Sequence, residues 1–302
     1  MSPPDTPEET IDDLIEAGDD WTGKPPPRDW LIPGWLPAGR VAMLTGPGKV
    51  GKSRLALQLA AAIAAGRKEW LPGGGPELEP VPKTDKDKIK DVAVLATWED
   101  EREEVKRRLH AMKMQKAVGH RLRYVAPRQA LWIHRDPWLG TGGDISPEGK
   151  KLRRYCKEKH ARLLIVDPRA AAYGLNENDR ALVRAFVSDW DRWAQESGCA
   201  VLLLVHPPKS EGAYSGTTDW HAAVRAVWEL TIRTVDTGDN NKNRAKAYRL
   251  ACLDTNYGPL PPPYWVGGYP KWKVADPAEA AAQFAKGRGG DHTAESQESV
   301  DV

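Results

Sequence analysis

The sequence predicts an α/β fold in which a mainly parallel central sheet carries helices on both faces and continues into a C-terminal antiparallel strand extension. Short apolar runs alternate with helical segments in the first two thirds of the chain, which is typical of parallel strands joined by crossover helices. After residue 225, strand-like runs follow one another without helices between them, which indicates antiparallel pairing. The 302 residues, 40% of them hydrophobic, suffice for a sizeable buried core.

Five short apolar runs predict the parallel strands, because each is bounded by polar or glycine-containing segments. They span residues 41–45, 92–97, 122–125, 162–166 and 200–205. The remainder of 118–148 indicates irregular structure. The antiparallel extension is predicted over residues 226–234, 247–254 and 264–266.

Helices are predicted where strong helix formers or amphipathic patterns separate these runs. Residues 53–65 (SRLALQLAAAIAA) consist of such formers and stop before Gly66. The other helices are predicted at 100–116, 150–159 and 179–196.

The composition divides the chain into an N-terminal arm, a folded domain and a C-terminal tail. Residues 1–28 are rich in Pro, Asp and Glu and predict a flexible N-terminal arm, whereas 29–276 form one folded domain. Within that domain, residues 72–91 carry three consecutive glycines and a Lys/Asp alternation and predict a long surface loop. Residues 277–302, an Ala-rich segment followed by polar residues, predict a disordered tail.

Composition also limits the function. A net charge of +2, from 44 basic and 42 acidic residues, excludes a protein that binds nucleic acid over its whole surface, so any such contact must be local. Three cysteines without CxxC spacing argue against disulfides and a zinc site, and favour a reducing cytoplasm. No apolar run approaches the roughly 18 residues that span a bilayer, and the acidic start resembles no targeting signal.

Residues 46–53, GPGKVGKS, match G-x-x-x-x-G-K-[ST] at every fixed position, between a predicted strand and a predicted helix. In such a P-loop the backbone N–H groups surround phosphate oxygens, the lysine reaches the β- and γ-phosphates, and the hydroxyl ligates Mg²⁺. The alternative, a Gly-rich turn that merely caps a helix, does not explain the full pattern. The residues expected to bind ATP are Gly46, Pro47, Gly48, Lys49, Val50, Gly51, Lys52 and Ser53.

Asp167 ends the apolar strand RLLIV. An apolar strand that ends in Asp beside a P-loop is the Walker B arrangement, in which the carboxylate holds Mg²⁺ directly or through water. Apolar runs that end in Asp are common at strand ends, so this prediction depends on the P-loop.

Glu99 and Asp100 follow the strand VAVLAT at the edge where parallel sheets bind ligands. We expect Glu99 to be the general base that polarises the attacking water, and Asp100 to cap the next helix. The alternative is that both carboxylates only cap that helix.

Two further residues have competing interpretations. His206 ends the strand AVLLLV, where it can sense the γ-phosphate or can simply be a solvated histidine. Arg225 precedes the antiparallel extension, where it can act as an arginine finger on an adjoining subunit or form a surface ion pair.

Taken in order, these segments resemble the hexameric replicative helicases of broad-host-range plasmids, the RepA type, and the wider bacterial and phage group of RecA-like AAA-family ATPases. The resemblance covers about residues 30–275. It rests on the segments PAGRVAMLTGPGKVGKS, RRLHAM, LLIVDP, NENDRALVRAF, SGCAVLLLVH, SGTTDWHAAVRAVW and DTNYG.

The resemblance implies a RecA-like P-loop ATPase that forms a homo-oligomeric, hexameric ring on single-stranded DNA. It matches Glu99 to the catalytic glutamate, His206 to the histidine that couples hydrolysis to the DNA-facing loop, and Arg225 to the arginine that acts across the subunit interface. The loops after Asp167 and His206 would face the central channel and contact DNA phosphates. Arg169 and Lys209 are the candidate contacts.

The sequence departs from the family pattern at two places. Ser215 stands before Gly216 where many relatives have Arg, and Pro207-Pro208 follows His206 where many have a longer basic loop. Both departures affect the expected DNA contacts and leave the ATPase prediction intact.

The sequence therefore predicts an ATP-driven DNA helicase or translocase of plasmid or phage replication. The alternative is a RecA-like recombination or replication-accessory ATPase that assembles on single-stranded DNA without unwinding it. A small-molecule kinase is disfavoured, because no substrate-binding lid segment is evident.

Overall fold

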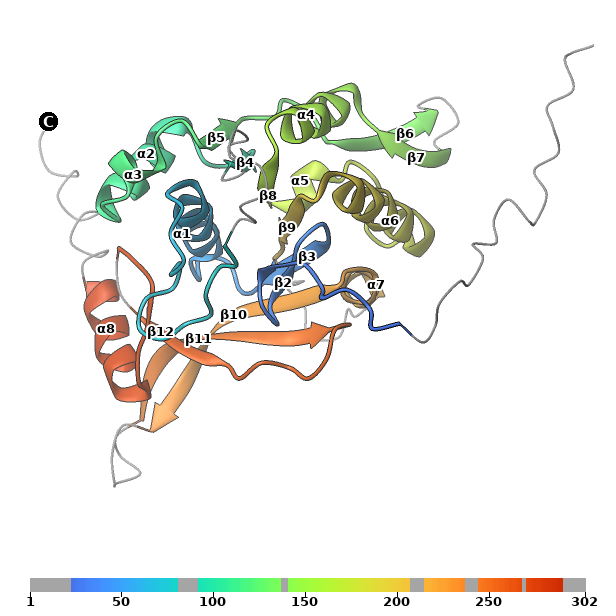
Figure 1. Cartoon of the computed structure of the whole chain (residues 1–302). Coiled ribbons are helices and arrows are strands. Elements are labelled where there is room, and N and C mark those ends of the chain that lie inside the picture. Colours follow the sequence, from blue (N-terminus) through green and yellow to red (C-terminus); the bar gives the residue numbers. More distant parts are fainter. Residues whose placement is uncertain are drawn as a thin grey trace, which may run out of the picture.

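The computed structural model of the chain describes six segments, which are separated by stretches outside the description (Figure 1). They are residues 23–80, 92–136, 141–206, 215–236, 244–267 and 270–289. The predicted N-terminal arm up to residue 22, the second half of the predicted loop 72–91, and Lys209 lie outside the described residues.

Within these segments, nine strands form one central sheet. Along the sheet they are β13 (Lys273–Val274), β12 (Tyr264–Gly267), β11 (Arg244–Thr255), β10 (Ala226–Asp236), β3 (Val41–Thr45), β9 (Ala200–Leu204), β8 (Ala161–Asp167), β4 (Val92–Thr97) and β5 (Leu122–Val125). Strands β3, β9, β8, β4 and β5 are parallel to one another, so their carboxyl ends lie at one edge. Side chains of β3 alternate between the two faces: Ala42 and Leu44 enter one core, Val41 and Met43 the other.

The extension joins the parallel part through β10. This strand pairs parallel with β3, in the register Ala226↔Ala42, and antiparallel with β11. Strand β10 therefore has one partner of each kind and joins the predicted antiparallel extension to the parallel part of the same sheet. Strands β10, β11 and β12 pair antiparallel in sequence order as predicted, β13 adds an antiparallel strand that was not predicted, and the fold class predicted from the sequence is confirmed.

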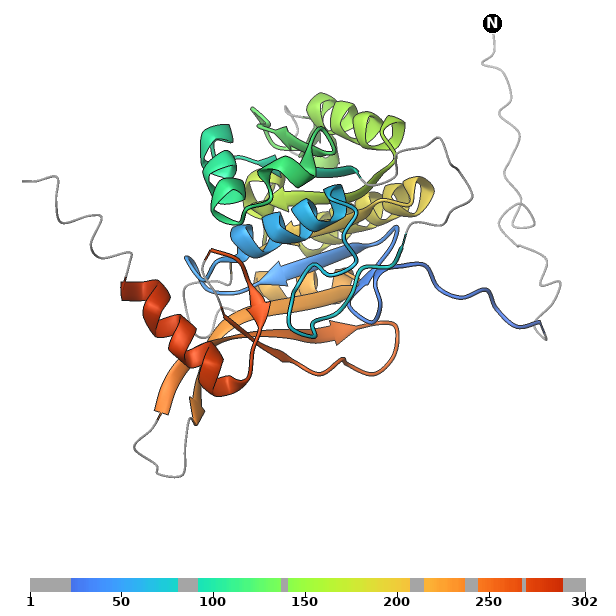
Figure 2. The same ribbon diagram turned by 60° about the vertical axis from the view of Figure 1, so that its left-hand side comes forward.

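Helices cover both faces of the sheet (Figures 1 and 2). They are α1 (Lys52–Ala64), α2 (Arg102–Ala111), α3 (Gln115–Val118), α4 (Pro147–Glu158), α5 (Arg169–Ala172), α6 (Arg180–Ser197), α7 (Ser215–Ala223) and α8 (Pro277–Gly289). Buried residues of α1 to α3 belong to the core on one face, and those of α4 to α7 to the core on the other. Among the described residues, no helix is long and apolar enough to cross a bilayer.

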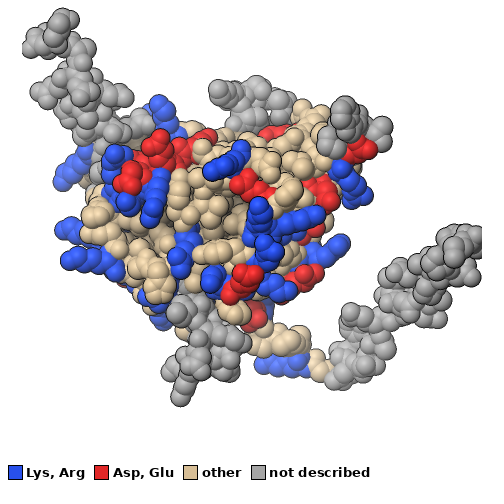
Figure 3. Space-filling model, turned by 90° about the horizontal axis from the view of Figure 1, so that it is seen from above, with Lys and Arg blue, Asp and Glu red and all other residues tan. Residues whose placement is uncertain are grey.

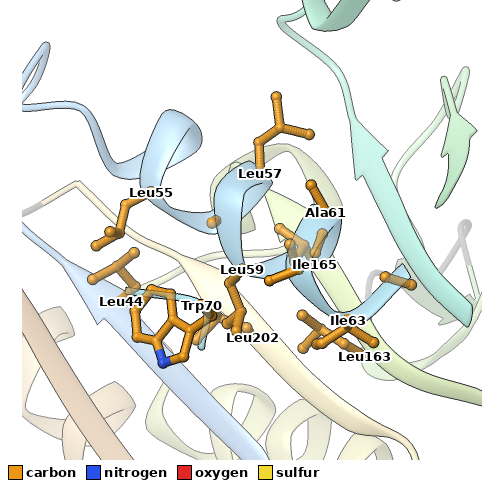
Figure 4. Packing of buried hydrophobic residues seen from close by; sticks show 14 of the residues in the cluster. Leu44, Leu55, Leu57, Leu59, Ala61, Ile63, Trp70, Leu163, Ile165 and Leu202 are labelled. Carbon is orange, nitrogen blue, oxygen red and sulfur yellow. The ribbon is translucent and has the colours of Figure 1, made fainter. Parts of the chain in front are cut away.

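Helix α1 is anchored by its apolar face, which fixes the direction in which its N-terminus points. Figure 4 shows Leu59 beside Leu202 and Trp70, and Ile63 beside Leu163, with every one of these side chains at most 1% exposed. Burial of a Leu or Ile side chain stabilises a fold by about 1.5–3 kcal/mol. The helix that carries the P-loop lysine is therefore held rigidly against the strands.

Several elements differ from the prediction. The charged helix predicted at 100–116 is split into α2 and α3, since the chain turns at Lys113 with φ of 55°. The stretch predicted to be irregular contains the hairpin β6 (Trp132–Asp136) and β7 (Thr141–Ile145). A further small pair, β1 (Trp30–Ile32) and β2 (Leu36–Pro37), precedes β3.

The predicted disordered tail is wrong for its first half. Residues Pro277–Gly289 form α8, which packs on β11 with Ala280 and Phe284 buried. Burial against the antiparallel strands stabilises a helix whose own sequence carries little amphipathic signal. Residues 290–302 lie outside the described residues.

Candidate nucleotide-binding site

The carboxyl edge of the parallel strands brings four predicted residues together. In the sheet order β3, β9, β8 and β4, these strands lead into the P-loop, His206, Asp167 and Glu99 respectively. Because neighbouring strands are a few ångströms apart, the four segments line a single edge.

The P-loop backbone adopts the left-handed conformations that its glycines allow. Gly46 has φ of 148° and Gly51 has φ of 103°, and a Cβ on Gly46 would overlap the carbonyl oxygen of Leu230 in β10. Gly51 is the N-cap of α1, and as a glycine it has no side chain that could cap the helix. The first N–H groups of α1 are thus available to an anion, where the helix dipole favours negative charge.

Lys52 points back into this loop. Its Nζ donates to the carbonyl oxygens of Gly46 at 2.7 Å and Pro47 at 2.9 Å, and the side chain is buried. Burial lowers the pKa of Lys52 to about 8, against the opposing effects of the Asp167 and Glu99 carboxylates. A bound phosphate would supply the anionic partner that this buried ammonium group favours.

Asp167 and Ser53 meet at the base of the loop. The Ser53 hydroxyl is hydrogen-bonded to the Asp167 carboxylate, and burial raises the pKa of that carboxyl group to about 6. A hydroxyl and a carboxylate oxygen beside each other fit Mg²⁺, which prefers oxygen ligands and takes only one or two from the protein when phosphates supply the rest. The residues present therefore fit Mg²⁺-ATP, with Ser53 and Asp167 as the residues that would hold the ion.

Glu99 and Asp100 have different surroundings. Glu99 is exposed at the site, close enough for its charge to raise the pKa of Lys52. Asp100 forms a two-pronged ion pair with the Arg108 guanidinium, with one N–O distance of 2.8 Å. The prediction that Asp100 caps the helix is wrong, because the N-cap of α2 is Glu101 and no side chain caps it. Arg108 thus engages Asp100, whereas the charge of Glu99 acts on Lys52 and His206 at the site.

His206 lies beside the P-loop lysine. Its Nδ1 is 3.1 Å from Lys52 Nζ. Burial, followed by the charge of Lys52, lowers the pKa of His206, while Glu99 has the opposite effect. The imidazole is therefore neutral at neutral pH and can accept a hydrogen bond from the ammonium group.

Arg225 lies at the opposite edge of the sheet from the P-loop, because it precedes the residue that pairs with Ala42 near the start of β3. Its Nε is 3.6 Å from a carboxylate oxygen of Asp191 in α6, and its side chain is 41% exposed. Arg40 is the closer partner of Asp191, at 2.7 Å. The structure does not bring Arg225 to the nucleotide site of its own chain.

Arg169, expected to contact DNA phosphates, is buried instead. Its guanidinium stacks on the ring of Trp220 in α7 at 4.1 Å and pairs with Glu177 at 3.2 Å. The prediction that Arg169 contacts DNA phosphates is therefore wrong for this structure, because only 5% of the residue is exposed. The sequence Arg-Ala-Ala-Ala shortly after the end of the strand favours a short helix, which is α5. In this helix the side chain of Arg169 is buried.

Two residues beside the P-loop carry no local sequence signal for that position. Leu230 in β10 limits the space at Gly46, and Trp272 before β13 limits the space at Gly51. Both come from the antiparallel extension, so only the pairing of β10 with β3 places them there.

A comparison with protein families adds an independent finding. Residues 5–212 match the family model described as an AAA domain. This match covers more than half of the chain and includes the P-loop, Glu99, Asp167 and His206.

Proposed function

The chain belongs to this AAA domain family of P-loop ATPases, and from that premise we propose that it is a ring-forming motor that hydrolyses ATP to translocate along or unwind DNA. Its setting would be plasmid or phage replication. The proposal joins the chemistry of the site to three features of the chain: the contact between His206 and Lys52, the exposed position of Arg225, and the charge distribution.

We assign the hydrolytic step to these side chains as follows. Water attacks the γ-phosphorus, the bond to the bridging oxygen breaks, and the water proton passes to a base. Glu99 is the base that we propose, and Lys52 stabilises the charge that develops on the phosphate oxygens. Mg²⁺, held by Ser53 and Asp167 together with the phosphates, would neutralise part of that charge.

The observation that carries the motor function is the 3.1 Å contact between His206 and Lys52. His206 is the residue at which β9 passes into the segment toward α7. A γ-phosphate that draws Lys52 toward itself would weaken this contact, so His206 would sense the nucleotide through Lys52. This is the coupling that a translocating ATPase needs between its nucleotide and its DNA-contacting loop.

A ring is supported by where Arg225 lies. Its half-exposed side chain at the amino edge of the sheet cannot reach its own P-loop, whereas an adjoining copy could present a nucleotide to it. An arginine that acts in trans stabilises the transition state of the neighbour's reaction.

DNA contact in this proposal is local. Figure 3 shows basic and acidic side chains interspersed on the face seen from above, which agrees with the net charge of +2. Phosphate contacts confined to a channel lined by loops from several subunits satisfy both observations.

The decisive experiment measures strand displacement on a forked duplex with ATP and Mg²⁺, beside ATP turnover with and without single-stranded DNA. The proposal predicts DNA-stimulated turnover and displacement that the Lys52→Ala variant lacks. Stimulation without displacement or movement along DNA would favour the accessory ATPase, and turnover indifferent to DNA would contradict both.

A further inference from the structure

Trp272 fills the space beside the P-loop turn at Gly51. The ring is fully buried, and a Cβ added to Gly51 would lie 2.7 Å from its Cζ2 atom. Real Cβ atoms do not approach a ring so closely, so Gly51 and the indole exclude any bulkier residue from this place. Gly51 holds a φ of 103°, which glycine adopts without a Cβ penalty, so the backbone conformation and the nearby ring both require glycine here.

The backbone of Trp272 forms two hydrogen bonds with the Gln58 side chain of α1, one as donor and one as acceptor. Its N–H donates to Gln58 Oε1 at 2.7 Å, and its carbonyl oxygen accepts from Gln58 Nε2 at 2.8 Å. Gln58 is completely buried and also donates to the carbonyl oxygen of Trp70 at 2.9 Å. A glutamine with both ends satisfied inside the core fixes the position of Trp272 relative to the helix.

A third contact reaches the first turn of α1. The Arg54 guanidinium lies over the Trp272 ring, 4.6 Å from its centroid. Arg54 directly follows Ser53, so the indole touches the helix on both sides of Lys52 and Ser53. Among the described residues, none accepts a hydrogen bond from the buried indole Nε1, so the contacts of the ring that are described are those of its edge and its π face.

The ring is itself supported from the C-terminal side. Tyr248 in β11 meets Trp272 edge to face at 4.9 Å and meets Phe284 of α8 at 4.8 Å. This aromatic column connects the C-terminal helix to the P-loop through three side chains.

We propose that Trp272 is a positioning residue for the P-loop. Its indole holds the Gly51 turn and the first turn of α1 so that the backbone N–H groups, Lys52 and Ser53 converge on the phosphates. The inference rests on the ATPase and does not depend on whether the chain unwinds DNA.

The test compares Trp272→Leu and Trp272→Phe with Trp190→Leu. Trp190 is an equally buried indole under an arginine, with Arg153 at 4.1 Å from its centroid, but it lies in α6 on the opposite face of the sheet. We measure the dissociation constant of Mg²⁺-ADP by calorimetry, and KM and kcat for ATP, at a temperature where circular dichroism shows each variant folded.

Trp272→Leu should raise both the Mg²⁺-ADP dissociation constant and KM by about tenfold, and change kcat by about threefold or less. The reason is that the P-loop then binds the phosphates less tightly in the ground state and in the transition state alike. Trp272→Phe should raise both by about threefold, since its shorter ring cannot reach Gly51 as the six-membered ring of the indole does. Trp190→Leu should lower the melting temperature and leave KM unchanged in the folded state, because Trp190 packs in the core on the opposite face of the sheet from the P-loop helix.

Unchanged nucleotide affinity in a folded Trp272→Leu, or an equal rise of KM in Trp190→Leu, would overturn the inference. If Trp272→Leu does not fold, Trp272→Phe decides by the same criterion. If the wild-type chain shows no turnover, the ATPase premise fails on its own, and the Mg²⁺-ADP measurement still tests the role of Trp272.

Discussion

His206 Nδ1 lies 3.1 Å from Lys52 Nζ, so the segment that directly follows β9 contacts the group that we propose to bind the terminal phosphates. Lys52 also donates to two carbonyl oxygens of the P-loop itself. An incoming γ-phosphate competes with all three partners for one ammonium group. We therefore expect His206 to respond to nucleotide through Lys52.

Replacement of His206 by Ala should weaken the coupling to DNA. If the imidazole transmits the state of Lys52, single-stranded DNA should no longer stimulate turnover, and the ratio of stimulated to basal rate should fall toward one. His160→Ala is the control, because His160 is an exposed histidine at the opposite edge, before β8. An unchanged ratio in His206→Ala would show that the coupling does not pass through this residue.

Lys52→Ala should abolish ATP turnover and leave the fold intact, since the change removes a charge and little packing. Loss of the charge that stabilises the transition state should cost ~10²-fold or more in rate. Phosphate-release assays beside circular dichroism check this. A folded variant that keeps more than about a tenth of the wild-type rate would place the catalytic lysine elsewhere.

Glu99→Gln should bind ATP but hydrolyse it slowly, because an amide can orient water yet cannot take its proton. Asp100→Asn is the matched change one residue away, and it breaks the ion pair with Arg108. That variant should keep its turnover and lose about 1.5–3 kcal/mol of unfolding free energy. Nucleotide binding, turnover and urea unfolding of both variants separate the two roles, and the reverse assignment would exchange these results.

Arg225→Ala should retain ATP affinity and folding but lose turnover by about 10³-fold if the residue acts in trans. Asp191 keeps Arg40, the Val41 N–H and Gln195 as partners, so little stability should be lost. Arg40→Ala removes the closer partner of the same carboxylate and should keep its turnover.

Mixed rings provide a second check on Arg225. Combining Arg225→Ala with Lys52→Ala subunits should restore some activity, because some interfaces then join an intact P-loop to an intact arginine. No restoration, although the subunits demonstrably exchange, would contradict the finger.

Asp191→Ala should destabilise the fold by about 3 kcal/mol, since it leaves Arg40 and a buried backbone N–H without their partner. Glu104→Ala is the comparison. Glu104 also faces two arginines, Arg107 and Arg108, but it is 39% exposed, so its loss should cost about 0.5 kcal/mol. Urea unfolding measures both, and similar losses would contradict the importance of burial.

Several parts of the fold and site could be predicted because their signals are local. The run 41–45 is apolar along its whole length, and GPGKVGKS then requires a turn followed by a helix, as observed in β3 and α1. Asp167 and Glu99 could be assigned to one edge because parallel strands align their carboxyl ends. These predictions need only the order of residues along each segment.

The tertiary structure decided the rest. Strand order places β9 between β3 and β8, and only that order sets His206 against Lys52. The pairing of β10 with β3 brings Trp272 to Gly51, and Arg108 holds Asp100 away from the capping role that its position in the sequence favours. Contacts between residues far apart in the chain depend on which faces of the sheet and helices pack together, and on which carboxylate lies nearest to a guanidinium group. The periodicity within a single segment does not contain this information.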